Sequence, residues 1–171
     1  MIFLSLGSNL SSLSGDNRFD NINGSIDYFS SHGFKEIKRS SYYETPSYPD
    51  LNNPKFINVV IEVLTHLSPE KFASVLISIE ETLERKRNQK NEPRTCDIDI
   101  IDYNGKVMDF SYKSLIFKVP HEKLIYRNFV LYPLQEIAPN WVHPITKEKI
   151  SNLIEKLPEE DRKSILKVKK N

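Results

Sequence analysis

The sequence predicts an α+β protein, a sandwich of a mainly antiparallel sheet with helices packed on it. Two patterns predict this class. Segments with apolar residues at every second position alternate with segments whose apolar residues recur every three or four positions. The chain of 171 residues is also long enough to bury one hydrophobic core without disulfides. We expect a single domain over residues 1–158 and a charged, mobile C-terminal tail over residues 159–171.

The first half of the chain contains a strand, a helix and two further strands. Residues 2–6 form a short apolar strand that Gly7 closes. The helix that follows has one apolar face, made by Phe19, Ile22, Ile26 and Phe29. Residues 36–43 form the next strand. A proline-rich loop at 45–54 then leads into a strand at 56–64, in which apolar and polar residues alternate.

The second half begins with a well-marked helix. Ser68 and Pro69 are typical of an N-cap and a first helical position. A polar, basic loop at 85–94 leads into a strand at 95–103. Asn104-Gly105 is typical of a two-residue hairpin turn, so we expect the partner strand to begin at Val107.

The C-terminal third is predicted to be helical. One helix covers residues 129–137, and a short one covers residues 152–156. The order strand, helix, strand, strand, helix, strand is the ferredoxin-like pattern. A fold of this kind does not by itself decide a function.

Composition excludes several classes of protein. The 24 Lys and Arg residues nearly balance the 23 Asp and Glu residues, which gives no support for general nucleic-acid or membrane attraction. The single cysteine, Cys96, cannot form an internal disulfide. There is no signal-peptide pattern and no apolar run of about 18 residues, so a cytoplasmic protein is expected. The P-loop motif for phosphate binding is missing as well.

Asp97 and Asp99 are the first candidates for chemistry. Residues i and i+2 of a strand point to the same face, so both carboxylates should project together. Mg²⁺ takes one or two such carboxylates and completes its shell with water and phosphate oxygens. Five basic residues lie just upstream and could hold phosphates: Arg85, Lys86, Arg87, Lys90 and Arg94. The alternatives are a solvated strand face and a positively charged helix end.

These residues resemble the signature of the 6-hydroxymethyl-7,8-dihydropterin pyrophosphokinases of folate synthesis. The most specific match is Pro93-Arg94-Thr95-x-Asp97-x-Asp99-Ile100. Further motifs follow the family order: Leu6-Gly7-Ser8-Asn9-Leu10, Tyr43-x-Thr45-Pro46, Phe56-Ile57-Asn58, Val119-Pro120-His121 and Arg127-x-Phe129-x-Leu131-x-Pro133-Leu134. The chain departs from the family at Asn91-Glu92, where members commonly have an aromatic and a small residue.

The resemblance implies transfer of pyrophosphate from ATP to the pterin, with two Mg²⁺ ions bound by Asp97 and Asp99. The catalytic residues that it implies are Arg85, Arg87, Arg94, Asp97 and Asp99. The residues implied at ATP are Glu80, Arg94, Ile100, His121 and Arg127. Those implied at the pterin are Thr45, Pro46, Tyr48, Phe56, Asn58 and Phe129. It also implies a monomer whose product passes to dihydropteroate synthase.

Other interpretations stay open for several of these residues. Asn58 could be a polar residue of an edge strand, Phe56 and Phe129 could be core residues, and His121 could cap a helix. A catalytically degenerate family member that acts as a binding protein is the alternative function. A ferredoxin-like RNA-binding module is a further alternative, but its aromatic strand pattern is missing.

Overall fold

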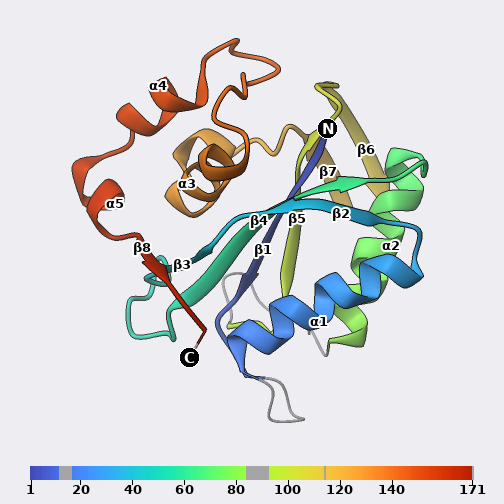
Figure 1. Cartoon of the computed structure of the whole chain (residues 1–171), viewed down its shortest axis with the longest axis horizontal. Coiled ribbons are helices and arrows are strands. Elements are labelled where there is room, and N and C mark those ends of the chain that lie inside the picture. Colours follow the sequence, from blue (N-terminus) through green and yellow to red (C-terminus); the bar gives the residue numbers. More distant parts are fainter. Residues whose placement is uncertain (12–16, 84–92, 114, 171) are drawn as a thin grey trace.

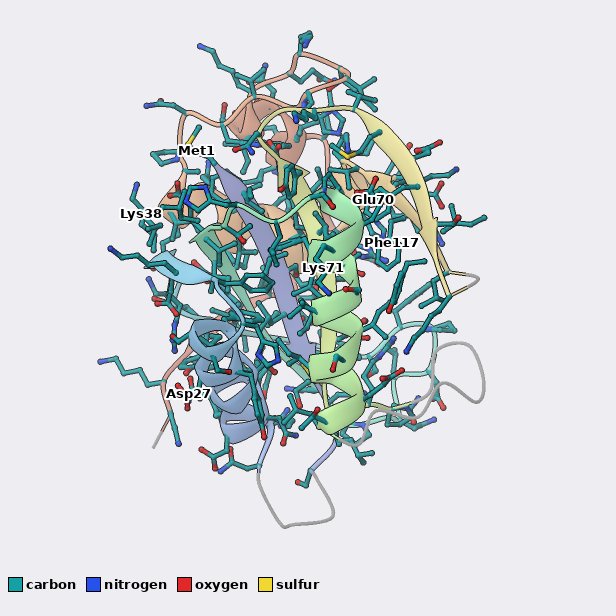
Figure 2. The ribbon with its side chains drawn as sticks, turned by 90° about the vertical axis from the view of Figure 1, so that its right-hand side faces the viewer. Met1, Asp27, Lys38, Glu70, Lys71 and Phe117 are labelled. Atoms are coloured by element: carbon teal, nitrogen blue, oxygen red, sulfur yellow. The ribbon has the colours of Figure 1, made fainter. Side chains whose placement is uncertain are left out.

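The computed structural model describes residues 1–11, 17–83, 93–113 and 115–170, and it confirms the predicted α+β class. Figure 1 shows a central sheet with helices on both of its faces. The first seven elements are β1 (Ile2–Ser8), α1 (Arg18–Ser31), β2 (Lys35–Arg39), β3 (Tyr42–Thr45), β4 (Phe56–Leu64), α2 (Pro69–Thr82) and β5 (Asp97–Tyr103). They follow the predicted order of six elements, except that two strands replace one of the predicted strands. Figure 2 shows α1 and α2 side by side in front of β1.

The main sheet has the ferredoxin-like strand order with one extra strand. Its order is β5-β1-β4-β3-β8, and β2 also pairs with β4. Strand β1 lies between β4 and β5 and is antiparallel to both. The single strand predicted at 36–43 is two strands, interrupted at Ser40 and Ser41, and both pair with β4. The Ser40 hydroxyl accepts a hydrogen bond from the Val60 N–H at 3.0 Å.

The alternation of side chains divides the core into two layers. On β4, Ile57 and Val59 belong to the layer that the sheet makes with α1 and α2. Val60 belongs to the opposite layer, which includes residues of α3 (Asn128–Ile137) and α4 (Ile150–Glu155). Because neighbours along a strand point to opposite faces, Asn58 faces the α3 side together with Val60.

The predicted hairpin partner of β5 is wrong. The turn exists, with φ values of 56° at Asn104 and 70° at Gly105. The strand that follows, β6 (Met108–Tyr112), pairs instead with β7 (Leu115–Val119) in a separate two-stranded sheet. The rings of Phe110 and Phe117 stack across that pair with centroids 5.2 Å apart. This aromatic cross-strand contact favours β7 as the partner of β6.

The C-terminal region contains more structure than the sequence suggested. Helices α3 and α4 lie within two residues of their predicted starts, and a 3-10 turn, η1 (Leu124–Tyr126), precedes α3. The segment expected to be a tail contains α5 (Glu159–Lys163) and β8 (Leu166–Val168), and β8 pairs with β3. Mobility of this segment stays a prediction. Among the described residues, no helix is long and apolar enough to cross a bilayer.

A buried carboxylate joins β5 to the C-terminal region. Asp102 is only 4% exposed and accepts hydrogen bonds from Trp141 Nε1 at 2.7 Å and from the Gly105 N–H at 2.6 Å. We expect Asp102→Ala to lower the free energy of unfolding by about 2–4 kcal/mol, because two donors lose their partner in the interior. Urea denaturation followed by circular dichroism measures this loss. Asp109→Ala, on exposed β6, is the control and should change stability by less than about 0.5 kcal/mol; equal effects of both variants would contradict the prediction.

Candidate active site

Strand β5 places the two aspartates on one face, as predicted. Asp97 lies opposite Gly7 of β1, and Asp99 lies opposite Ser5. Ile98 and Ile100, which alternate with them, are buried in the core layer beneath α1 and α2. Both carboxylates therefore point to the α3 side of the sheet, where their side chains are 26% and 30% exposed.

Each aspartate is paired with one arginine, and each arginine lies over one phenylalanine. Arg94 Nη1 is 3.1 Å from Asp97 Oδ2, and Arg127 Nη1 is 2.8 Å from Asp99 Oδ2. The Arg94 guanidinium lies 5.4 Å from the centre of the Phe56 ring, and Arg127 lies 5.4 Å from that of Phe129. These are cation–π distances. Residues from β4, β5 and α3, with the segment before β5, thus converge on one site.

Arg94 has an unused donor in this site. Its Nε is buried and has no hydrogen-bond partner within the described part of the chain. A guanidinium offers five N–H donors, and a buried donor without a partner is unfavourable. The Arg94 side chain as a whole is 24% exposed, so an anionic ligand beside Asp97 could accept from its terminal nitrogens.

His121 combines a structural and a site contact. Its Nδ1 accepts a hydrogen bond from the Lys123 N–H at 3.1 Å, in the turn before η1. The proton of the neutral ring is then on Nε2, which lies 3.9 Å from Asp99 Oδ2. Burial lowers the pKa of His121, although the Asp99 charge opposes this effect. His121 therefore holds this turn and lies close to the site, but it does not cap η1.

Asn58 lies across β1 from the aspartates. Gly7 pairs with Asn58 on one side and with Asp97 on the other, so the three share a face and span two strand spacings, about 10 Å. Asn58 is 3% exposed, and its Nδ2 donates to Thr45 Oγ1 at 3.0 Å and to the Tyr43 carbonyl at 3.3 Å. The amide is thereby oriented, which leaves Oδ1 to accept from a ligand.

Gly7 is a site residue that the sequence did not single out. A Cβ atom at this position would lie 3.2 Å from Asn58 Oδ1 and 3.6 Å from Phe56 Cδ1. The first distance is too short for an ordinary contact, so a side chain here would displace the Asn58 amide. The available signal was a glycine inside an apolar strand, which often marks close approach of another group.

Several predicted residues lie elsewhere. Ile100 is 4% exposed and its side chain is on the opposite face, so only its backbone could contact a ligand on the α3 side. Glu80, 3% exposed on α2, accepts a hydrogen bond from the Ile98 N–H at 2.7 Å. Pro46 and Tyr48 are exposed, Tyr48 by 87%. Arg85, Arg87, Asn91 and Glu92 lie outside the described residues.

The donor set suits magnesium. No cluster of three or more His, Cys, Asp or Glu side chains that could hold a metal occurs in the described segments. Mg²⁺ needs only one or two carboxylates when phosphate and water supply the other oxygens. Asp97 and Asp99 fit that requirement, whereas a structural zinc site takes four protein ligands.

Comparison with known proteins agrees with this geometry. Residues 3–139 match the family described as 7,8-dihydro-6-hydroxymethylpterin-pyrophosphokinase (HPPK). The chain belongs to this family. The predicted family is therefore confirmed.

The chain is similar to proteins of different length. It is 35% identical over 150 residues to the 2-amino-4-hydroxy-6-hydroxymethyldihydropteridine pyrophosphokinase of Aquifex aeolicus, covering 87% of each chain. It is 36% identical over 165 residues to the folic acid synthesis protein fol1 of Pneumocystis carinii, covering 96% of this chain but only 21% of that longer one.

A solved structure, an HPPK-DHPS in complex with substrates, resembles the fold with a TM-score of 0.73 at 15% identity. That match covers 97% of this chain and 48% of the other. It supports the fold alone.

Proposed function

We propose that the chain transfers the pyrophosphoryl group of ATP to 6-hydroxymethyl-7,8-dihydropterin, giving AMP and the pterin diphosphate for folate synthesis. One observation carries this proposal: two arginine-paired carboxylates and an oriented amide lie on the same sheet face, with Gly7 between Asp97 and Asn58. Charged groups suit the triphosphate, and the amide suits the edge of a flat heterocycle.

The reaction exchanges one phosphorus–oxygen bond for another. The hydroxyl oxygen of the pterin bonds to the β-phosphorus of ATP, and the bond from the β-phosphorus to the α–β bridging oxygen breaks. AMP leaves with that oxygen, and the hydroxyl proton passes to solvent. We assign no side chain as general base. The protein contributes chiefly by holding both substrates and by stabilising charge on the phosphates.

Among the residues that the structure describes, Arg94 and Arg127 could stabilise this phosphate charge. Each now uses a terminal nitrogen on an aspartate, and each has further donors for phosphate oxygens. His121 Nε2, 3.9 Å from Asp99 Oδ2, could donate a hydrogen bond to the same phosphates. Arg85 and Arg87 remain proposed catalytic residues on the basis of the family signature.

Asp97 and Asp99 are the residues that would hold magnesium. Two Mg²⁺ ions would neutralise phosphate charge and orient the attacking and leaving oxygens. The aspartate side chains are partly exposed and lie on one face, which leaves room for ligands that are not protein atoms. Glu80 supports the backbone of β5 between them, through its hydrogen bond to Ile98.

The proposed pterin site consists of Asn58 with Phe56 and Phe129, of Thr45 at the end of β3, and of Pro46 and Tyr48 in the adjoining loop. Asn58→Ala should weaken pterin binding by about tenfold to a hundredfold, because hydrogen bonds worth about 1.5–3 kcal/mol are lost. Calorimetric titration with the pterin measures this change. Titration of the same variant with MgATP is the control, because the nucleotide site should be unaffected; undiminished pterin affinity would contradict the assignment.

The nucleotide product that is formed from ATP distinguishes the candidate functions. The protein is mixed with MgATP and hydroxymethyl-dihydropterin, and the nucleotides are separated by chromatography. AMP supports pyrophosphoryl transfer, whereas ADP would indicate an ordinary kinase. No turnover, together with pterin binding, would favour the degenerate binding protein.

The cellular setting follows from the same proposal. We propose a cytoplasmic monomer whose product passes to dihydropteroate synthase. The similarity to longer folic acid synthesis proteins supports a link to later steps of the same synthesis.

A further inference from the structure

Asn9 is a buried side chain that connects three segments of the site. It follows the last residue of β1 and is 2% exposed. Its Oδ1 accepts a hydrogen bond from the Arg94 N–H at 2.8 Å. Its Nδ2 donates to Ser47 Oγ and to the Pro54 carbonyl, both at 3.1 Å. One amide therefore contacts the segment before β5 and both ends of the loop between β3 and β4.

Backbone contacts strengthen the same junction. The N–H groups of Asn9 and Leu10 both donate to the Arg94 carbonyl at 3.1 Å. Ser47, 4% exposed, also donates to the Pro54 carbonyl, at 2.6 Å. The amide oxygen of Asn9 bonds to Arg94, and the amide nitrogen bonds to the loop between β3 and β4. Arg94 and the loop are therefore bonded to the two ends of one amide.

The two sides belong to different substrates. Arg94 is paired with Asp97 and is on the proposed phosphate side. The loop begins after Thr45, which holds the Asn58 amide on the proposed pterin side. The Asn9 side chain thus bonds both to the backbone of Arg94, a proposed phosphate-binding residue, and to the loop beside the proposed pterin site.

We propose that Asn9 is a positioning residue that couples nucleotide binding to pterin binding. This inference rests on the proposed function. When phosphate fixes Arg94, the oriented Asn9 amide fixes the loop, so less conformational entropy remains to be lost when the pterin binds. The coupling must be reciprocal, because it is a free energy shared by two binding equilibria.

The coupling can be measured without turnover. Pterin is titrated by calorimetry into the protein alone and into the protein saturated with Mg²⁺ and α,β-methylene-ATP, whose α–β bridge cannot be cleaved. The ratio of the two Kd values is the coupling factor. We expect a factor of about ten or more in the native protein and about one to two in Asn9→Ala.

Asn21→Ala is a matched control. Asn21 is also 2% exposed, and its Nδ2 donates to the Leu10 carbonyl at 2.8 Å and to Ser8 Oγ at 3.3 Å. It therefore supports the same end of β1 from α1 without a hydrogen bond to Arg94 or to the 45–54 loop. If Asn9 had only a structural role, as Asn21 has, both substitutions would lower stability and neither would change the coupling factor.

Ser47→Ala serves as a second variant if Asn9→Ala does not fold, which circular dichroism shows. It removes one partner of Nδ2 and leaves the Arg94 contact, so the coupling factor should fall part of the way. A native coupling factor near one, or a native value retained in the folded variants, would overturn the inference. Absence of AMP formation by the native protein would instead overturn the proposed function.

Discussion

Asp97→Ala and Asp99→Ala are each expected to lower AMP formation by about 10³-fold or more, which corresponds to about 4 kcal/mol of transition-state stabilisation. Each variant removes an oxygen ligand and a negative charge from the proposed magnesium site. The fold should persist, because both side chains are partly exposed and their ion pairs are worth at most about 1 kcal/mol. Initial rates at saturating Mg²⁺ and substrates measure the loss, and circular dichroism verifies the fold.

Glu36→Ala is the matched control for these variants. Glu36 Oε2 is paired with Arg39 at 2.6 Å, and its side chain is 30% exposed on β2, much as the aspartates are on β5. Removing it deletes a similar ion pair away from the site, so turnover should stay within about twofold of the native value. Normal turnover of either aspartate variant in magnesium would exclude the two-metal mechanism.

Local pattern was sufficient to predict most of the fold. Periodicity located β4 at its observed bounds, and the Ser68-Pro69 signal located the start of α2. Both depend on side chains within a few positions of one another, and sequence spacing reports such contacts directly. The missed β8 depends on a remote partner, because it pairs with β3 and nothing near Val168 shows this. The pairing of β6 is a different error: it is local, since Tyr112 lies opposite Leu115, and it was missed because the hairpin turn was assigned at Asn104-Gly105.

The site likewise combines features that are local in the sequence with features that depend on remote segments. The two aspartates share a face because they are two residues apart, and this followed from strand geometry alone. Gly7 and Asn9 were only part of a motif in the sequence. The roles of these two residues depend on atoms of Asn58 and Arg94, which lie far along the chain. The register that brings them together is a property of the whole sheet.

Arg94→Ala is expected to lower kcat by about 10²–10³-fold, because a preorganised donor to developing phosphate charge is lost. The affinity for MgATP should fall less, since Mg²⁺ and the other cations still bind the triphosphate. Arg94→Lys should recover only part of the rate. A lysine keeps the charge, but it cannot reproduce the planar contact over Phe56 together with the hydrogen bonds of the guanidinium. Steady-state kinetics give kcat, and titration with α,β-methylene-ATP gives the affinity.

Arg39→Ala provides the corresponding control, because Arg39 is paired with Glu36 on β2 and lies outside the site. It should leave kcat nearly unchanged. The comparison of rate with affinity then decides what Arg94 does. Loss of a group that acts mainly in the transition state lowers kcat more than it lowers ground-state affinity, whereas loss of a group that only binds lowers the affinity and leaves kcat unchanged. Equal losses in kcat/KM and in nucleotide affinity, with kcat unchanged, would show that Arg94 only holds ATP. The charge stabilisation would then have to come from Arg127 or from the proposed loop arginines, Arg85 and Arg87.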